Sequence, residues 1–307
     1  MRSTFTWLDY SERDRRRMVD VIEALRETEA RDELGIGGVR NAVSDKLFPG
    51  TSTLQTRARY FLFIPWIYRR LDRRGVPRAR IGHEVRNCEV ALMHALLRGG
   101  EGEGVIGRSK LEKLQRMPSG IYWRGLWEWG IWHQEESQDT YHRSANGAEG
   151  QRGGRVERDE NGEPLVDGYR ETWHAGLPQE PMEFLVQTSF SLTQVEAEYL
   201  RERILTSKPG TLLAFLVGRD DPPERTAFPW ELELPGVPPD LSEQLRHARN
   251  FSEVMHGASL LYNLMVAEAA RKEENVSKYE QRLSEWSLAC VLSLWAGKEC
   301  GKLSASA

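Results

Sequence analysis

Apolar residues recur every three or four positions along most of this chain, which is the spacing of an amphipathic helix. The densest apolar stretch runs from Leu54 to Arg73 and is interrupted by Pro65. Three hydroxyl residues precede it, and they can accept the free amide hydrogens of a first helical turn: Thr51, Ser52 and Thr53. The pattern therefore predicts a mostly buried helix that begins near Leu54, bends near Pro65 and ends before Gly75.

The same spacing predicts further helices on both sides of this segment. They cover residues 11–30, 39–47, 78–97, 110–115, 120–131, 193–205, 212–217, 240–265 and 276–294. Capping boxes mark the starts at Ser11 and Thr193, and Ser119 is expected to cap the helix that follows it. The last two helices are expected to pack as an antiparallel pair.

Residues 110–131 have the outline of a helix-turn-helix, in which Arg124 would be exposed on the second helix. That helix lacks the Asn, Gln or several Arg residues that read base edges. The favoured interpretation is therefore an aromatic core helix.

Glycine, proline and charge separate the helical regions. Residues 143–168 are poor in apolar side chains, so we expect a mobile insertion, with a small β-hairpin at Asn161-Gly162. The chain is expected to form a basic helical N-terminal half (1–142), a mobile insertion and irregular linker (143–190) and a helical C-terminal half (191–307). The predicted fold class is mostly α, a multi-helix globular protein.

Charge is unevenly distributed, although the net charge of the 307 residues is only -4. Between Arg40 and Arg98, twelve Arg and Lys stand against four Asp and Glu, so this segment carries +8 and the remainder carries -12. A basic segment of this kind can present a face to nucleic acid, or it can dock onto the acidic part of the same chain. The sequence leaves both interpretations open.

The start of the predicted Leu54 helix is the candidate anion-binding site, because free amides, hydroxyls and nearby arginines can bind a phosphate. Residues two apart on a helix diverge by about 200°, so Arg57 and Arg59 cannot both face one anion. We expect Arg57 to bind the phosphate and Arg59 to pair with a structural acid. The full candidate set is Ser52, Thr53, Arg57, Arg59, Arg69 and Arg73. In the alternative interpretation the hydroxyls only cap the helix and the arginines only hold the fold.

No catalytic or cofactor motif is present. The glycines at 35–38 lack the spacing of a dinucleotide fingerprint, and no Gly-Lys precedes Ser52 as a phosphate loop requires. The three cysteines have no C-x-x-C spacing and no H-E-x-x-H occurs. We therefore expect no cofactor and no metal site. The lack of a long apolar run or a signal peptide predicts a cytoplasmic protein without a membrane partner.

Several stretches resemble an uncharacterised bacterial family, one of the domains of unknown function. They include T-F-T-W-L-D-Y near the start, L-F-P-G-T-S-T-L-Q-T-R-A-R-Y-F from residue 47 and M-H-G-A-S-L-L-Y-N-L from residue 255. The resemblance covers most of the chain, and T-R-A-R-Y-F is its most specific part. It implies a place near bacterial antiviral genes, with helicases or phospholipase-D-like nucleases as partner proteins, and it supplies no catalytic residues.

The leading functional hypothesis is a non-enzymatic subunit of a bacterial antiviral defence complex that binds DNA, RNA or a partner protein. The alternative is an enzyme of undescribed mechanism that uses Cys88 or a histidine in a cleft. A cleft that joins a perturbed titratable group to a nucleophile would favour the enzyme. A broad basic surface would favour the binding subunit.

We predict that residues 143–168 are dispensable for folding, because they have little apolar surface to bury. Replacing them with a short Gly/Ser linker should shift the melting temperature little, as measured by circular dichroism. Loss of the helical signal would show that the insertion is packed.

Overall fold

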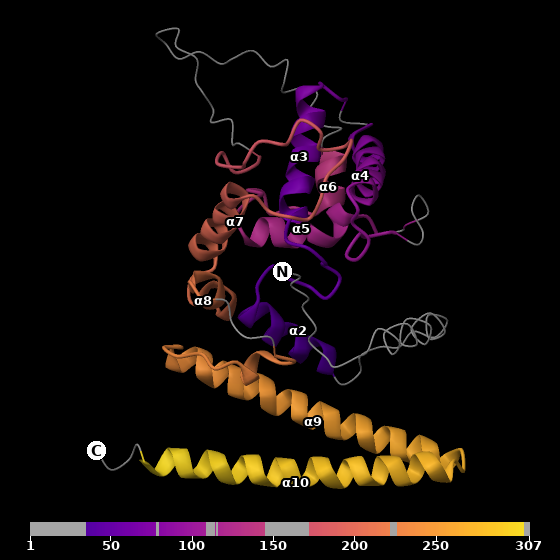
Figure 1. Cartoon of the computed structure of the whole chain (residues 1–307), viewed down its shortest axis with the longest axis vertical. Helices are drawn as coiled ribbons and strands as arrows, with labels where there is room; N and C mark the ends of the chain where they lie inside the picture. The colour runs from indigo at the N-terminus through magenta and orange to yellow at the C-terminus, as the bar shows by residue number, and fades with distance from the viewer. Residues whose placement is uncertain are drawn as a thin grey trace. The chain divides into compact units, whose positions relative to one another are not determined.

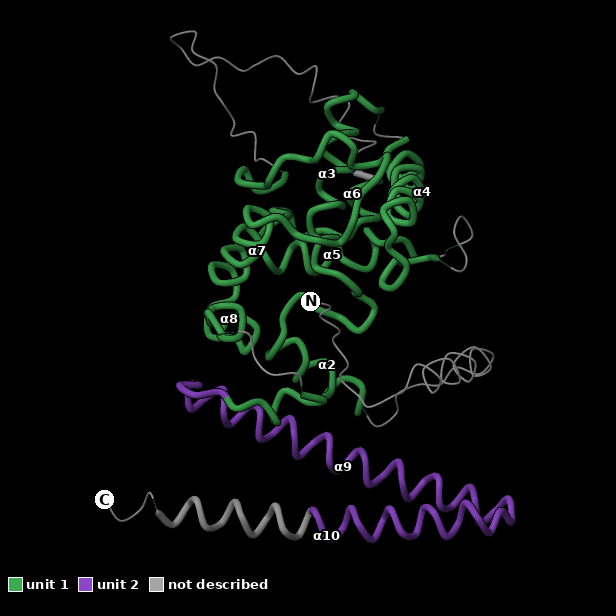
Figure 2. Tube along the Cα trace, in the orientation of Figure 1, with its two compact units in different colours: residues 1–233 green, residues 234–307 purple. Residues whose placement is uncertain are grey.

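The computed structural model describes residues 35–77, 80–108, 114, 116–144, 172–221 and 226–303. The helices predicted over 11–30 and 110–115 and the hairpin at Asn161 lie largely or wholly outside these residues. The chain divides between Glu233 and Leu234 into two units (Figure 2). The division lies within the region predicted as the C-terminal half.

The first unit is built from helices joined by irregular segments (Figure 1). Its helices are α2 (Ile36–Leu47), α3 (Tyr60–Arg73), α4 (Ile81–Arg98), α5 (Pro118–Glu128), α6 (Gln138–Ser144), α7 (Gln194–Ser207) and α8 (Leu212–Gly218). In the described part of the chain, β pairing is limited to an isolated antiparallel bridge between Trp132 and Trp173. The predicted mostly α, multi-helix class is confirmed.

Helix α3 is the centre of the first unit. Every residue from Tyr60 to Tyr68 is buried, and α3 packs against both α4 and α5. Phe61 stacks on Trp129 with ring centroids 3.8 Å apart, and Phe63 stacks on Phe184 at 5.5 Å. Aromatic side chains remove large apolar areas from water, so these contacts account for much of the stabilisation around α3.

The predicted start of this helix is wrong, because α3 begins at Tyr60 rather than near Leu54. The hydroxyl of Tyr122 accepts hydrogen bonds from the backbone amides of Thr56 and Arg57, at 2.8 and 3.1 Å. These amides therefore have a partner without joining a helix. The predicted end is right, since α3 stops at Arg73 and Gly75 adopts a left-handed conformation with φ of 63°.

A buried ion pair joins α3 to α7. Arg59 Nη2 lies 2.7 Å from Glu196 Oε1, and the two side chains are only 7% and 5% exposed. The second oxygen of Glu196 accepts the amide hydrogen of Thr193, which completes the predicted capping box. Arg59 also donates to the backbone carbonyl of Ser189 at 2.8 Å. Arg59 thus has the structural acid that was expected for one of the two arginines.

The second unit is a pair of long helices, α9 (Pro239–Ala269) and α10 (Glu273–Leu303), which a short turn connects and which pack along each other. The indole of Trp286 on α10 donates to the carbonyl of Glu253 on α9 at 2.9 Å. A Cβ added to Gly257 would stand 2.3 Å from the Trp286 ring, so only glycine fits at this crossing. The predicted antiparallel pair is confirmed. None of the helices in the described ranges is both long enough and apolar enough to cross a membrane.

We predict that Arg59→Met destabilises the protein by roughly 3 to 5 kcal/mol, because it leaves the carboxylate of Glu196 buried without a counter-charge. The double variant Arg59→Met/Glu196→Gln removes both charges and keeps the capping geometry, so it should recover much of this loss. Urea unfolding measures both changes.

Arg246→Met is the matched control, because Arg246 pairs with Glu243 on an exposed surface. It should cost less than about 1 kcal/mol. An Arg59→Met variant as stable as this control would contradict a stabilising role for the buried pair.

Candidate functional site

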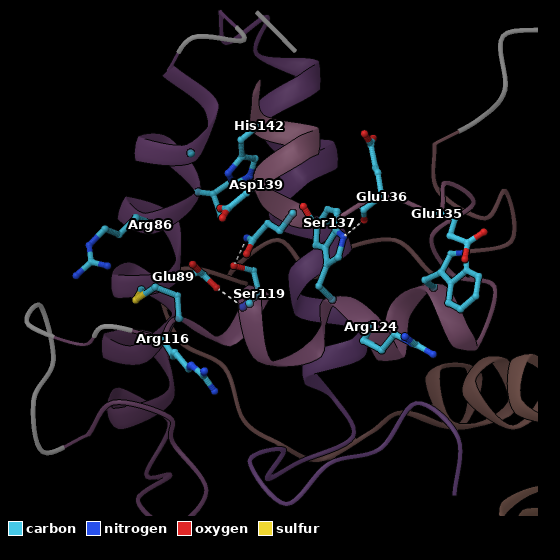
Figure 3. Close-up of a pocket in the computed structure, with 17 residues that line it drawn as sticks. Arg86, Glu89, Arg116, Ser119, Arg124, Glu135, Glu136, Ser137, Asp139 and His142 are labelled. Atoms are coloured by element: carbon cyan, nitrogen blue, oxygen red, sulfur yellow. Dashed lines mark hydrogen bonds between the residues drawn. The ribbon is translucent and has the colours of Figure 1, made fainter. Parts of the chain in front are cut away.

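A pocket of about 820 Å³ lies among α4, α5 and the start of α6 (Figure 3). This volume is within the range of small-ligand sites. The pocket is partly apolar, with Val85 and Trp123 in its lining, and partly polar, with Glu89, Ser119 and Gln138. It therefore combines the apolar walls and convergent polar groups that are typical of ligand sites.

A chain of hydrogen bonds forms one side of the pocket. The Ser119 amide donates to Glu89 Oε1 at 2.6 Å, and Gln138 Nε2 donates to the Ser119 hydroxyl at 2.6 Å. The same amide nitrogen of Gln138 donates to the Tyr68 hydroxyl at 2.9 Å, which lies 2.8 Å from His142 Nε2. Four helices, α3 to α6, thus contribute to one polar network.

Glu89 is the most perturbed carboxyl of this network. Burial raises its pKa from 4.5 to about 7, although hydrogen bonds from the amide and hydroxyl of Ser119 and the charge of Arg86 oppose this rise. A carboxyl with a pKa near 7 exchanges its proton at neutral pH, and such groups cluster at functional sites.

The protonation states of Tyr68 and His142 follow from the burial and the hydrogen bonds of the two side chains. Burial raises the pKa of Tyr68 well above its usual value, so the phenol keeps its proton. Because Gln138 donates to the phenolic oxygen, the Tyr68 hydroxyl donates in turn to His142 Nε2. Burial lowers the pKa of His142, while Asp139 opposes this effect, so the imidazole is neutral and carries its proton on Nδ1.

The rim of the pocket carries both positively and negatively charged side chains. Arg86 and Arg116 lie on the α4 side of the network and Arg124 on the opposite side (Figure 3). The guanidinium of Arg124 lies 5.2 Å from the ring centre of Trp127, whose neighbour Trp123 forms another wall. Carboxylates also line the pocket, at Glu135, Glu136 and Asp139. The site therefore suits a polar ligand with a flat ring rather than a simple anion.

The predicted site residues near the start of α3, Ser52, Thr53 and Arg57, do not form the expected capped helix start. Ser52 and Thr53 are exposed in the segment before the helix and do not cap it, because the N-cap is Arg59. Arg57 donates to the carbonyls of Thr56 and Glu103, at 3.2 and 3.3 Å, and lies over the ring of Phe190. A phosphate contact at Arg57 stays a prediction.

The remaining predicted arginines lie towards the other end of α3. Arg69 donates to the carbonyl of Leu177 at 3.5 Å, and Arg73 Nη2 lies 2.5 Å from Glu180 Oε1. Arg59 is buried with Glu196. The structure therefore distributes the six residues over different surroundings instead of gathering them around one anion.

The polar network was not predicted from the sequence. Ser119 was expected to cap the helix that follows it, whereas α5 begins at Pro118 after Met117 and the Ser119 amide donates to Glu89. One signal was available, because Glu89 interrupts the buried stripe of α4 between Val85 and Leu92. A carboxylate on a buried helix face needs hydrogen-bond partners, and these come from elements distant in sequence.

Cysteine and histidine side chains can support nucleophilic catalysis or metal binding. Cys88 is buried, and this burial raises the pKa of its thiol, so the thiol is less nucleophilic than an exposed one. Cys88 does not line the pocket, whereas His142 does. Among the described residues, no three histidine, cysteine or acidic side chains are grouped so as to hold a metal ion.

We predict that, because of Glu89, the free energy of unfolding decreases as pH rises from about 4.5 to about 7. Its pKa is raised on folding, so the folded state holds a proton that the unfolded state has released in this window. The free energy of unfolding should fall by roughly 3 kcal/mol from this group as pH rises. Urea unfolding at pH 5, 6, 7 and 8 measures it.

Glu89→Gln is the comparison, because an amide mimics the protonated carboxyl and still accepts the Ser119 hydrogen bond. Its unfolding free energy should fall less over the same range. Equal slopes for the wild type and Glu89→Gln would contradict the raised pKa.

No curated protein matches the chain, and no solved structure matches it. A family match covers residues 2–284, which is nearly the whole chain and includes the pocket and its hydrogen-bond network. It agrees with the resemblance to an uncharacterised family. The chain belongs to the family of unknown function DUF6361.

Proposed function

We propose that this protein is a non-enzymatic nucleic-acid-binding subunit, and that the pocket among α4, α5 and α6 receives one unstacked nucleotide of a DNA or RNA strand. The observation that carries the proposal is the meeting of tryptophan walls, rim arginines and a polar network in one ligand-sized pocket. Aromatic faces stack on any base, and arginine binds phosphate through charge-assisted hydrogen bonds.

The polar network supports this proposal by its chemistry. Glu89, with a pKa of about 7, can accept a hydrogen bond when ionised and donate one when protonated. The edge of a nucleobase carries both donors and acceptors, so either form has a complementary group. The carboxylates on the rim disfavour a bare phosphate and favour a ligand that also presents donors.

The wider role follows from the family resemblance. We propose that the protein acts in a bacterial antiviral defence complex, with a helicase or a nuclease as its partner protein. In such a complex a non-enzymatic subunit would supply substrate binding, and the partner would supply the chemistry.

We predict that the protein binds labelled single-stranded DNA or RNA, as measured by fluorescence anisotropy at several salt concentrations. Arg116 is exposed at the pocket. Arg116→Ala should therefore lower the salt slope by about one, as expected for one lost phosphate contact. Trp127→Leu should weaken binding by roughly 5- to 100-fold through lost base stacking. Arg57→Ala in the same series tests the contact predicted near the start of α3.

Arg282→Ala is the control, because Arg282 is exposed on α10 in the other unit and its loss changes the net charge equally. Circular dichroism shows that each variant folds. The proposal fails if the wild type binds neither nucleic acid at low salt. It also fails if Arg116→Ala and Trp127→Leu bind as the control does.

One observation favours the enzyme as a second candidate, because Glu89 combines a pKa of about 7 with a place in the pocket. In that case Glu89 moves a proton, while His142 and Ser119 hold the network in position. Incubating the protein with the oligonucleotides separates the candidates. Turnover that Glu89→Gln abolishes, with binding retained, supports the enzyme.

A further inference from the structure

One face of α9 presents a stripe of apolar side chains to solvent. The members of this stripe are separated by four, three and four positions, which keeps them on one side of the helix: Val254, Ala258, Leu261 and Met265. Val254, Leu261 and Met265 are 64%, 48% and 59% exposed, and Tyr262 beside them is 67% exposed. Contiguous exposed apolar side chains of this kind mark interaction surfaces.

The stripe is separate from the face of α9 that packs on α10. The two helices run along each other (Figure 1), and Gly257 of α9 meets the ring of Trp286. Gly257 and Leu260 are buried, and each directly precedes a residue of the stripe. Successive residues of a helix diverge by about 100°. The stripe therefore points roughly a quarter turn away from α10, where a further helix has room to pack on α9.

The stripe also lies in an uncharged part of α9. No Asp, Glu, Lys or Arg occurs over residues 254–267, whereas Arg246 and Arg249 before this stretch and Glu268 after it are exposed. A helix that stays in contact with solvent carries charged or polar residues on its outer face. The composition of this stretch is instead typical of a helix that is covered on a second side.

We propose that the stripe packs against the same stripe of a second copy of this chain, so that two α9 helices lie antiparallel in a homodimer. The spacing of four, three and four is the same when it is read in either direction. In an antiparallel pair, Val254 is then level with Met265 of the second copy, and Ala258 is level with Leu261 of the second copy. A two-fold dimer requires a surface that is complementary to itself in this way.

Charge favours the antiparallel direction. Glu268 follows Met265 by three positions on the same side of α9. In a parallel pair it would face Glu268 of the second copy, and like charges repel. In the antiparallel pair it is level with Phe251 of the second copy. The two-fold axis then passes between Ala258 and Leu261, within the uncharged stretch, so no charged residue meets its own copy there.

The size of the surface fits a dimer of moderate affinity. The larger side chains of the stripe, together with Tyr262 and Val266, expose on the order of 100 Å² each. Covering them in both copies would bury on the order of 1,000 Å², which is close to the lower limit for a specific interface. We therefore expect a dissociation constant of about 1 to 100 μM.

Sedimentation equilibrium of the full chain tests the dimer, at concentrations that bracket the expected dissociation constant. The average mass of the wild type should rise towards twice the monomer mass. Met265→Glu should weaken the dimer by about 100-fold, because it places a carboxylate against Val254 at both ends of the interface. Asn263→Glu is the matched control: it adds the same charge to an exposed position of α9, about 200° around the helix from Leu261, and should dimerise as the wild type does.

A charge pair tests the direction of the two helices. Val254→Lys should weaken the dimer as Met265→Glu does. The double variant Val254→Lys/Met265→Glu should dimerise at least about 10-fold more tightly than either single variant, because each lysine is level with a glutamate of the second copy. A parallel pair would set lysine against lysine and glutamate against glutamate. A double variant no tighter than the single variants would therefore overturn the antiparallel pairing.

Circular dichroism of the same variants separates association from folding. The stripe is exposed within one copy, so Met265→Glu should keep the helical signal of the wild type. Loss of that signal would mean that Met265 packs within its own chain, and this would overturn the proposal. A wild type that stays monomeric throughout would overturn it too and would leave the stripe to a different partner protein. A Met265→Glu variant that dimerises like Asn263→Glu would have the same consequence for the second copy.

This interface goes beyond the proposed function, because it lies in the second unit whereas the pocket lies in the first. The oligonucleotide assay with Arg116→Ala measures the pocket, and sedimentation without nucleic acid measures the association of two chains. The interface and the proposed function can therefore fail separately.

Discussion

The constraint on which the first unit depends is the burial of the first part of α3, Tyr60 to Tyr68, on all sides. A helix that is apolar around most of its circumference must be covered by other elements on every face. In this protein α4 and α5 cover two faces, and the irregular segment that carries Phe184 and Phe190 covers another. Arg59, at the start of α3, then binds Glu196 and so ties α7 to the same core.

The position of α3 also explains why a polar network can exist beside the core. Tyr68 lies in the buried stretch of α3 with its hydroxyl directed to Gln138 and His142. A buried phenol needs a hydrogen-bond partner, and these two residues of α6 provide it. Through this network the core satisfies its buried polar groups, and Glu89, Ser119, Gln138 and His142 of the network also line the pocket.

Much of the fold could be predicted from the sequence, because helical spacing and capping boxes are local signals. The end of α3, the capping box at Thr193 and the pairing of α9 with α10 all follow from such signals. The start of α3 could not be predicted, because it depends on Tyr122, which lies 66 positions from Thr56 in the sequence. The candidate pocket could not be predicted for the same reason, since its residues lie on α4, α5, α6 and adjoining segments, which meet only when the chain has folded.

The ion pair between α3 and α7 also affects how the chain folds while it is being synthesised. Arg59 and Glu196 are 137 positions apart. At a synthesis rate of about 5 to 20 residues per second, the aromatic α3 segment is made roughly 7 to 27 s before its acidic partner. During that interval part of the apolar surface of α3 is exposed to solvent. We therefore expect chaperones that bind exposed apolar segments to bind the nascent chain.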